Sequence, residues 1–285
     1  MNAGTMADVQ AWFRQIVDPR CDVTAMVQVG GGSGCSVARC RVRTRAGEKD
    51  LHIKIYKRGM DDYSGLGPID TARKHSLALV EVPRFGIRVP QVIGMKASGG
   101  EAAIVSETVG GGDWAHSARL RAAGALSRLH RIRPSDLSGD LQTLVRRSRP
   151  NRDRIVRGIA EYSGQLNLRH PGWHLERADL AQEARGVLAS EEPDCSSPTL
   201  VHGDFFSRNL LAVDGGVVVI DWDLLALGDP VWDLGHLLCA DRCVAGDERR
   251  EVLASYGAGV AQDRLRWHEA AWTAFWDLRD LLELS

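Results

Sequence analysis

The stretch from residue 200 to residue 234 constrains the fold of this chain more than any other. Its apolar run 217–220 predicts a short buried strand, and the glycine turn before it predicts a hairpin with the preceding apolar segment. The hairpin would hold Asp204 and Asn209, which precede it, in a fixed relation to Asp221, which follows it. Mg²⁺ prefers oxygen ligands and usually keeps water and phosphate oxygens as well. The pattern therefore predicts a site for Mg²⁺ and a phosphate group.

This stretch carries three motifs in one order: His202-Gly203-Asp204 with Asn209, Ile220-Asp221-Trp222, and Gly228-Asp229-Pro230 with Asp233-Leu234. Together they resemble the signature of the aminoglycoside phosphotransferase family, small-molecule kinases that are similar to protein kinases. Gly203 stands where the catalytic loop of protein kinases has Arg. Trp222-Asp223 stands where the D-F-G motif of protein kinases has Phe-Gly. Both differences fit the small-molecule kinases.

The resemblance implies an α+β, two-lobed protein-kinase-like fold. Residues 1–108 would form a small β-rich N-lobe with the nucleotide lid, and residues 109–285 a larger, mainly helical C-lobe with the catalytic loop, metal site and acceptor pocket. The periodicity of apolar residues predicts helices at 8–17, 70–80, 117–132, 177–189 and 264–284, and strands at 23–29, 37–44, 51–56 and 102–106. We interpret the arginine-rich segment 131–154 as a loop and a solvated face.

Composition excludes several classes of protein. The 285 residues carry a net charge of −1, which gives no basis for binding nucleic acid or a membrane surface. No apolar run is long enough to span a membrane, and residues 1–10 lack the pattern of a secretory signal. The six cysteines form no C-x-x-C pair, so we expect reduced structural thiols. We expect a cytoplasmic protein with a small-molecule partner, and the oligomeric state stays open.

A glycine-rich segment between two strand patterns predicts a phosphate lid, because glycine lets backbone amides approach phosphate oxygens. The candidate nucleotide-binding residues there are Gly31, Gly32, Ser33 and Gly34. The alternative is a flexible hairpin turn. The next strand places Lys54 on the face opposite to its apolar residues, and a lone lysine in a strand is usually solvated. The resemblance implies that Lys54 pairs with the α- and β-phosphates.

The usual partner of that lysine is absent from the expected place. In kinase-like proteins it pairs with a Glu on the following helix. Here that helix offers Arg73, Lys74 and His75, and Glu81 comes at its end. Either Glu81 is the partner after a shift of the helix, or the pair is altered.

The segment after the last predicted N-lobe strand resembles a kinase hinge. The resemblance implies that the backbone of Glu107 and Val109 hydrogen-bonds the purine. Ser106 would be the gatekeeper, and its small size leaves the choice between ATP and GTP open. The alternative is a glycine-rich linker without a ligand, and both can hold at once.

The resemblance assigns roles to the residues of the central motifs. Asp204 would orient the acceptor hydroxyl and take its proton, while Asn209 and Asp221 would hold Mg²⁺ on the phosphates. Asp223 would face the acceptor pocket and attract an amine. We interpret His202 as a structural residue rather than a general base, and Asp229 and Asp233 as groups that cap a helix and fix the loop.

The expected function is ATP-dependent, or GTP-dependent, O-phosphorylation of a small hydroxylated molecule. An aminoglycoside or another antibiotic is the first candidate acceptor, which implies resistance or self-protection. The alternative is a metabolic kinase for choline, homoserine or a sugar. A regulatory pseudokinase is the rival from another class; the missing Glu supports it, and the intact Asp204, Asn209 and Asp221 oppose it. A protein kinase is disfavoured because the chain lacks D-F-G and A-P-E.

Two further features of the C-terminal region have open interpretations. We interpret its three tryptophans as core residues rather than as residues that stack on a substrate: Trp267, Trp272 and Trp276. Its acidic residues favour a solvated face, although some could line a pocket for a cationic substrate: Asp247, Glu248, Glu251, Glu269, Asp277 and Asp280.

Overall fold

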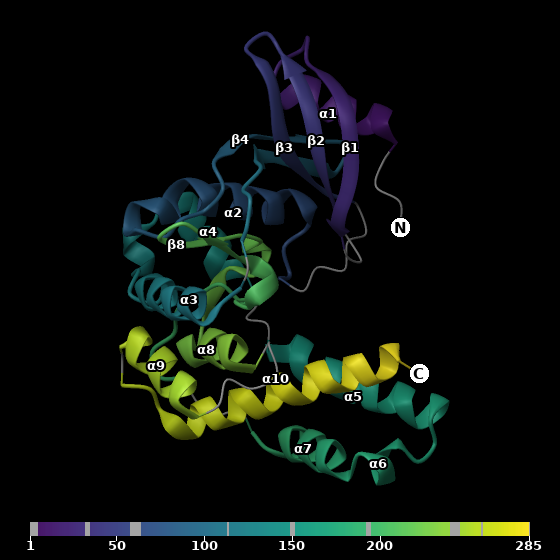
Figure 1. The fold of residues 1–285 in the computed structure, drawn as a ribbon, viewed down its shortest axis with the longest axis vertical. Helices are drawn as coiled ribbons and strands as arrows, with labels where there is room; N and C mark the ends of the chain where they lie inside the picture. Colours follow the sequence, from purple (N-terminus) through teal and green to yellow (C-terminus); the bar gives the residue numbers. More distant parts are fainter. Residues whose placement is uncertain are drawn as a thin grey trace.

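An antiparallel sheet forms one part of the molecule, and helices form most of the other (Figure 1). The computed structural model describes residues 5–31, 35–57, 64–112, 114–148, 152–191, 195–239, 246–257 and 259–284. This is the α+β, two-lobed architecture expected from the sequence. The sheet ends at Glu107, close to the lobe boundary expected after residue 108, and that division of the chain stays a prediction.

The sheet has the spatial order β1-β2-β3-β5-β4, and all neighbouring strands are antiparallel. Its strands are β1 (Asp22–Gly31), β2 (Cys35–Thr44), β3 (Gly47–Tyr56), β4 (Val92–Ser98) and β5 (Glu101–Glu107). Helix α1 (Met6–Ile16) packs on one face and α2 (Pro68–Glu81) on the other. The two faces follow from the alternation of side chains along a strand. On β5, for example, Val105 belongs to the apolar cluster of α1, and Ile104 to that of α2.

The same alternation on β3 orients Lys54. Leu51, Ile53 and Ile55 are buried in the cluster beneath α1. Lys54 and Tyr56 therefore point to the opposite face, toward α2 and the helical part. The orientation predicted for Lys54 is confirmed.

The helical part is organised around α10, which packs against α8, α5 and α7 (Figure 1). Its helices are α3 (His116–Leu129), α4 (Gly139–Arg147), α5 (Arg152–Arg169), α6 (Trp173–Glu176), α7 (Ala178–Ala189), α8 (Pro230–Cys239), α9 (Gly246–Tyr256) and α10 (Gln262–Glu283). Trp232, Trp272 and Phe275 are buried at the centre of this packing. Trp272 lies in the core as expected, whereas Trp267 and Trp276 are partly exposed. A Cβ added at Gly158 of α5 would lie 2.4 Å from Cε2 of Phe275, so the two helices meet closely there.

The interpretation of segment 131–154 as a loop was wrong, because α4 and the start of α5 lie within it. In α4, Leu141, Leu144 and Val145 are buried, while Arg146 and Arg147 in its last turn are exposed. The helix therefore has an apolar face that the arginines obscure in the sequence, and Lys or Arg near a helix C-terminus is favourable.

The predicted hairpin is confirmed: β7 (Leu210–Val213) and β8 (Gly216–Val219) are antiparallel. A second short pair joins β6 (Thr199–Val201) to β9 (Ala226–Gly228). Because β6 leads into the loop with Asp204 and β9 follows the loop with Asp221, this pairing draws the two loops together. Five cysteines of the described residues are free thiols, and Cys243 lies outside the described residues. In the described part of the chain, no helix has both the length and the apolar composition needed to cross a bilayer.

Candidate active site

A cavity of about 580 Å³ lies between the sheet and the catalytic hairpin. This volume is typical of small-molecule sites. The cavity brings together seven residues that the sequence marked as functional: Lys54, Ser106, Glu107, Val109, Asp204, Asn209 and Asp221. Gly31 ends β1 next to Gly30, which lines the cavity, whereas Gly32, Ser33 and Gly34 lie outside the described residues. Their proposed roles toward a nucleotide stay proposals.

The catalytic loop is held by internal hydrogen bonds. The amide nitrogen of Asn209 donates to the backbone oxygen of Asp204 at 2.9 Å and to its Oδ2 at 3.0 Å. The side-chain oxygen of Asn209 is left for another partner. Asp204 is partly exposed and lines the cavity, so its carboxylate can reach a bound molecule.

His202 links the two loops and does not line the cavity. Its Nδ1 accepts the backbone N–H of Asp204 at 3.3 Å, and its Nε2 lies 3.0 Å from the backbone oxygen of Ile220. An acceptor at Nδ1 leaves Nε2 as the donor in a neutral imidazole. Burial lowers the pKa of His202 and so favours this neutral form. These contacts support the structural role proposed from the sequence.

Helix α8 fixes the backbone at the start of the catalytic loop. Asp233, which is fully buried, accepts the N–H of His202 at 2.7 Å and the N–H of Gly203 at 2.9 Å. Asp229, one residue before α8, accepts the N–H of Val231 at 2.9 Å, as an N-cap residue does. The motif thus positions the loop that carries Asp204.

Asp221 follows β8 in an unusual backbone conformation. Its φ of 64° and ψ of 65° are left-handed, and no other non-glycine residue of the described chain has a positive φ. Such a conformation costs about 1–3 kcal/mol and is concentrated at functional sites. It turns the partly exposed carboxylate of Asp221 into the cavity, where Oδ1 lies 2.6 Å from Nζ of Lys54.

Asp223 has a different position from the one that the sequence suggested. Its Oδ2 lies 2.6 Å from Nζ of Lys54, and its Oδ1 accepts the hydroxyl of Tyr56 at 2.6 Å. Nδ1 of His75 lies 2.7 Å from the same Oδ1. Asp223 is absent from the cavity lining, and both of its oxygens already have partners. We therefore replace the predicted contact with an acceptor amine by a role in holding Lys54.

The charges of this group are mutually dependent. Burial opposes the charged forms of Asp223 and Lys54, but their attraction outweighs it, so the pKa of Asp223 lies well below its usual range. The pKa of Lys54 is raised for the same reason, with Asp221 as its strongest charged partner. Burial raises the pKa of Tyr56, which therefore stays a hydrogen-bond donor.

Glu81 is not the partner of Lys54. Glu81 bonds elsewhere: its Oε2 accepts the N–H of Ser138 at 2.8 Å and pairs with Arg84 at 3.1 Å. Lys74 is buried and donates to Ser148 and to the backbone oxygen of Leu225. Of the three residues considered on α2, His75 faces the site, and the carboxylate beside Lys54 comes from the C-lobe. The pair is altered.

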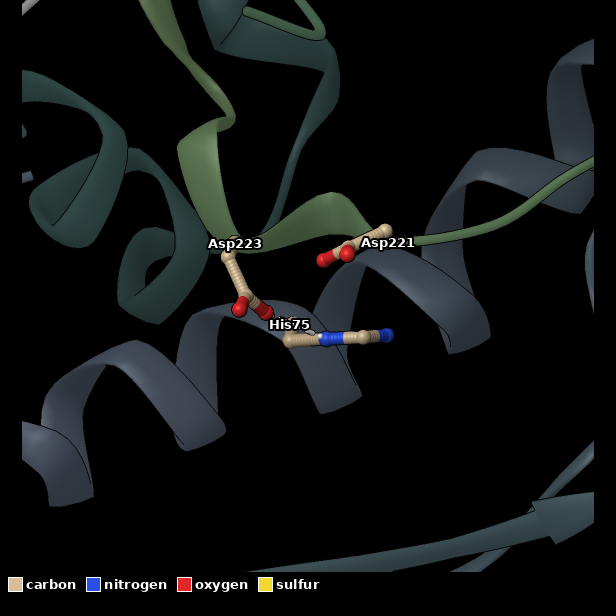
Figure 2. A group of neighbouring side chains, drawn as sticks. All are labelled: His75, Asp221 and Asp223. Atoms are coloured by element: carbon tan, nitrogen blue, oxygen red, sulfur yellow. Dashed lines mark hydrogen bonds and ion pairs between the residues drawn. The ribbon is translucent and has the colours of Figure 1, made fainter. Parts of the chain in front are cut away.

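His75, Asp221 and Asp223 gather their potential ligand atoms within 4.8 Å of one another, a spacing that could hold a metal ion. Figure 2 shows the two carboxylates above the imidazole, which extends from α2. The ammonium group of Lys54, however, lies 2.6 Å from an oxygen of each aspartate. Because the ammonium group already contacts both carboxylates, we assign this cluster to lysine binding.

Mg²⁺ fits a different pair of side chains in the same cavity. Asn209 uses its amide nitrogen to bind Asp204, and Asp221 uses Oδ1 to bind Lys54. The side-chain oxygen of Asn209 and Oδ2 of Asp221 can therefore serve as metal ligands at the cavity. Both are hard oxygen donors, which suits Mg²⁺. The donor set therefore agrees with the metal role expected for Asn209 and Asp221.

Several cavity residues and charge pairs were not predicted from the sequence. Arg208 and Phe206 line the cavity beside Asp204, and His75 and Leu79 line it from α2. The acidic residues of the C-terminal region are largely paired: Glu248 and Glu251 contact His116, and Glu269 binds Arg249 in two hydrogen bonds. These three carboxylates thus belong to helix contacts and not to a pocket for a cation.

Comparisons with known proteins identify the family of this chain. A sequence profile described as the phosphotransferase enzyme family matches residues 33–271. An aminoglycoside 3'-phosphotransferase from Escherichia coli is 28% identical over 253 residues, which is 84% of this chain and 85% of that protein.

Solved structures show the same fold. A choline/ethanolamine kinase family protein from Mesorhizobium loti has a TM-score of 0.59 and 20% identity, over 98% of this chain and 87% of that chain. The GDP complex of an aminoglycoside 2'-phosphotransferase mutant has a TM-score of 0.63 and 15% identity, over 98% of this chain and 90% of that chain.

Proposed function

The chain belongs to the phosphotransferase enzyme family, and we propose that it transfers the terminal phosphoryl group of a purine nucleoside triphosphate to a hydroxyl group of a small molecule. One observation carries this proposal: a single cavity is lined by Lys54, Asp204, Asn209 and Asp221. Phosphoryl transfer requires an aligned acceptor, a metal ion and neutralised phosphate oxygens more than covalent catalysis. These four side chains can supply those requirements.

The nucleotide would enter between the hinge and the lysine. Glu107 and Val109 line one end of the cavity, and their backbone groups are candidates for binding the purine. Lys54, held by two carboxylates, would contact the phosphates, and Gly31 to Gly34 would form the lid. Mg²⁺ bound through Asn209 and Asp221 would neutralise charge on the phosphates. Both ATP and GTP are candidate donors.

Asp204 would orient the acceptor. Its carboxylate reaches the cavity from the loop that also carries Asn209, so it can accept the proton of a hydroxyl that approaches the phosphate. The acceptor oxygen then forms the new bond to phosphorus while the bond to the nucleoside diphosphate breaks. Proximity and orientation contribute much of the rate in such a site.

We further propose an aminoglycoside as the acceptor, with drug resistance or self-protection as the biological role. The support is the 28% identity to an aminoglycoside 3'-phosphotransferase over most of both chains. The described residues of the cavity name no acceptor by themselves, because acceptor choice depends on the site and not on the fold.

The decisive experiment is a coupled turnover assay with Mg-ATP and with Mg-GTP. The acceptor panel contains aminoglycosides, macrolides, nucleoside antibiotics, choline, homoserine and simple sugars, and Asp204→Ala is the control. Turnover of an aminoglycoside, with a mass gain of one phosphate that the control lacks, is the expected result. Turnover confined to choline, homoserine or a sugar would replace the antibiotic by a metabolic acceptor. Nucleotide binding without turnover of any compound would count against the enzyme and for a regulatory pseudokinase.

A further inference from the structure

His236 of α8 is a buried imidazole that faces the candidate catalytic carboxylate. Its Nδ1 lies 3.8 Å from Oδ1 of Asp204, and the ring is completely shielded from solvent. The other oxygen of Asp204, Oδ2, accepts a hydrogen bond from Asn209 at 3.0 Å. Each oxygen of the carboxylate therefore faces a different side chain. His236 lies outside the three motifs of residues 200–234.

The hydrogen bond on the far side of the ring determines where its proton lies. Nε1 of Trp276 donates to Nε2 of His236 at 3.1 Å. An indole N–H can only donate, so Nε2 must be the acceptor and the neutral ring carries its proton on Nδ1. That proton is on the atom nearest to Asp204. The distance of 3.8 Å exceeds a hydrogen bond, but such contacts often tighten when substrate binds.

Aromatic stacking fixes the plane of the imidazole. The ring is nearly parallel to Trp272, with centroids 3.5 Å apart and an interplanar angle of 8°. It also stacks on Phe206, at 4.7 Å and 16°. The ring of Trp276 is also close to parallel with it, at 5.8 Å and 22°, so aromatic side chains hold the imidazole in its plane. Trp272 comes from α10 and Phe206 from the catalytic loop, two residues after Asp204, so the stack joins the loop to the helical core.

One face of α8 thus reaches both the backbone and the side chain of the catalytic loop. Asp233 and His236 are three residues apart, and residues at this spacing lie on the same face of a helix. Asp233 accepts the N–H groups of His202 and Gly203, and His236 faces the carboxylate of the next residue.

We propose that His236 is a positioning residue for the phosphoryl transfer, which fixes the orientation of the Asp204 carboxylate through its Nδ1–H. The inference rests on the proposed function of Asp204. His236 neither takes nor gives a proton in this role. It directs Oδ1, as Asn209 directs Oδ2, so that the carboxylate keeps one orientation toward the acceptor hydroxyl. Without it the carboxylate rotates among orientations, and the aligned fraction falls.

The first test reads the tautomer and needs no turnover. Long-range ¹H–¹⁵N NMR of protein labelled at histidine distinguishes Nδ1–H from Nε2–H, and His236→Asn assigns the signal by its loss. The Nδ1–H tautomer is the expected result for the full chain at neutral pH. A neutral ring with its proton on Nε2 overturns the inference, whatever the acceptor is.

The second test compares two variants, with Mg-ATP and the acceptor that the wild type phosphorylates. His236→Phe keeps a stacking ring but has no N–H, whereas His236→Asn keeps an amide N–H close to the place of Nδ1. We expect His236→Phe to lower kcat about 10- to 100-fold, the range seen when the residue that orients a metal ligand is removed from other enzymes. Its Kd for Mg-ATP, measured by calorimetry, should stay within about 3-fold. His236→Asn should recover most of kcat.

The outcomes separate the inference from the function it rests on. A kcat of His236→Phe equal to that of the wild type overturns the positioning role. Equal losses in both variants overturn it as well, because His236 would then act through the packing of its ring and not through an N–H group. Absence of turnover by the wild type instead contradicts the proposed function. The tautomer measurement then still tests whether Nδ1 of His236 carries a proton toward Asp204.

Discussion

Lys54 and Asp223 form an ion pair of 2.6 Å whose side chains are 11% and 14% exposed. The aspartate belongs to the helical part of the chain, four residues after the end of β8 in the loop that carries Asp221, and not to α2. Tyr56 and His75 hold its other oxygen. The resemblance to kinases implied a Glu on the helix, and here the helix supplies the imidazole that supports the carboxylate instead. The buried carboxylate of Asp223 thus contacts side chains from the sheet and from α2, and it lies in the loop that also carries Asp221.

Asp223→Asn should therefore impair use of the nucleotide. The amide keeps the shape of the side chain but removes the charge that holds Lys54, and hydrogen bonds to charged groups are each worth about 1.5–3 kcal/mol. Since about 1.4 kcal/mol corresponds to a tenfold change, kcat/KM for Mg-ATP should fall about 10- to 100-fold. Steady-state kinetics at saturating acceptor measures the change.

Asp263→Asn is the matched control for that prediction. Asp263 also pairs with a basic side chain, Arg266, but it is 89% exposed. Exposed ion pairs contribute about 0–1 kcal/mol, so this variant should be indistinguishable from the wild type. Equal kinetics of Asp223→Asn and Asp263→Asn would show that Lys54 does not depend on Asp223.

Asp204→Ala and Asp221→Ala should separate catalysis from nucleotide binding. Asp204→Ala removes the candidate base while the side chains of Lys54 and Asp221 remain, so turnover should be lost and Mg-nucleotide affinity nearly kept. Asp221→Ala removes a candidate metal ligand and a partner of Lys54, so Mg-nucleotide affinity should itself fall. Turnover assays and calorimetry measure the two effects. Turnover by Asp204→Ala within a few-fold of the wild type, or unchanged affinity of Asp221→Ala, would contradict the assigned roles.

The sequence was most informative where the determining interactions are local. The hairpin of β7 and β8 follows from two apolar runs around a glycine turn, and its ends place Asn209 and Asp221. The altered lysine pair could not be predicted in this way. Tyr56 and Asp223 are 167 residues apart, and His75 and Asp223 are 148 apart, so tertiary packing alone brings them together.

Local pattern also failed where charge hides an apolar face. Helix α4 buries Leu141, Leu144 and Val145 at helical spacing, but the surrounding arginines suggested a solvated loop. His236 was missed for a related reason. It follows Asp233 by three residues on α8, and its partner Asp204 comes close only through the tertiary packing of the catalytic loop against that helix.

Gly203→Ala should destabilise the catalytic loop. Gly203 has a φ of +85°, and an added Cβ would lie 2.6 Å from the backbone oxygen of Leu224. That oxygen cannot move without shifting the loop that carries Asp221. A left-handed conformation costs a non-glycine residue about 1–3 kcal/mol, and the steric clash adds to that cost. We expect a lower free energy of unfolding and loss of turnover.

Gly215→Ala is the control, because Gly215 has a φ of +68° but nothing within 4 Å of an added Cβ. It shares the backbone strain and lacks the clash. Denaturant unfolding should therefore rank Gly203→Ala clearly below Gly215→Ala, and equal losses of stability would mean that the contact with Leu224 relaxes without cost.

His202 should make the stability of the protein depend on pH below neutrality. Burial lowers its pKa from the ordinary 6.5 in the folded state. Below pH 6.5 the unfolded chain therefore binds a proton at this position that the folded chain does not, and the free energy of unfolding falls as the pH falls.

His202→Gln keeps a donor for the backbone oxygen of Ile220 but cannot titrate. The variant should be less stable than the wild type at pH 7.5, by about 1 kcal/mol for an impaired hydrogen bond. In urea unfolding, the stability of the variant should also fall less than that of the wild type between pH 7.5 and pH 5, because glutamine does not bind a proton. The carboxylates with lowered pKa, such as Asp223 and Asp229, titrate below this range and do not obscure the difference. Parallel pH profiles of the two proteins would mean that His202 is protonated as readily in the folded chain as in the unfolded one.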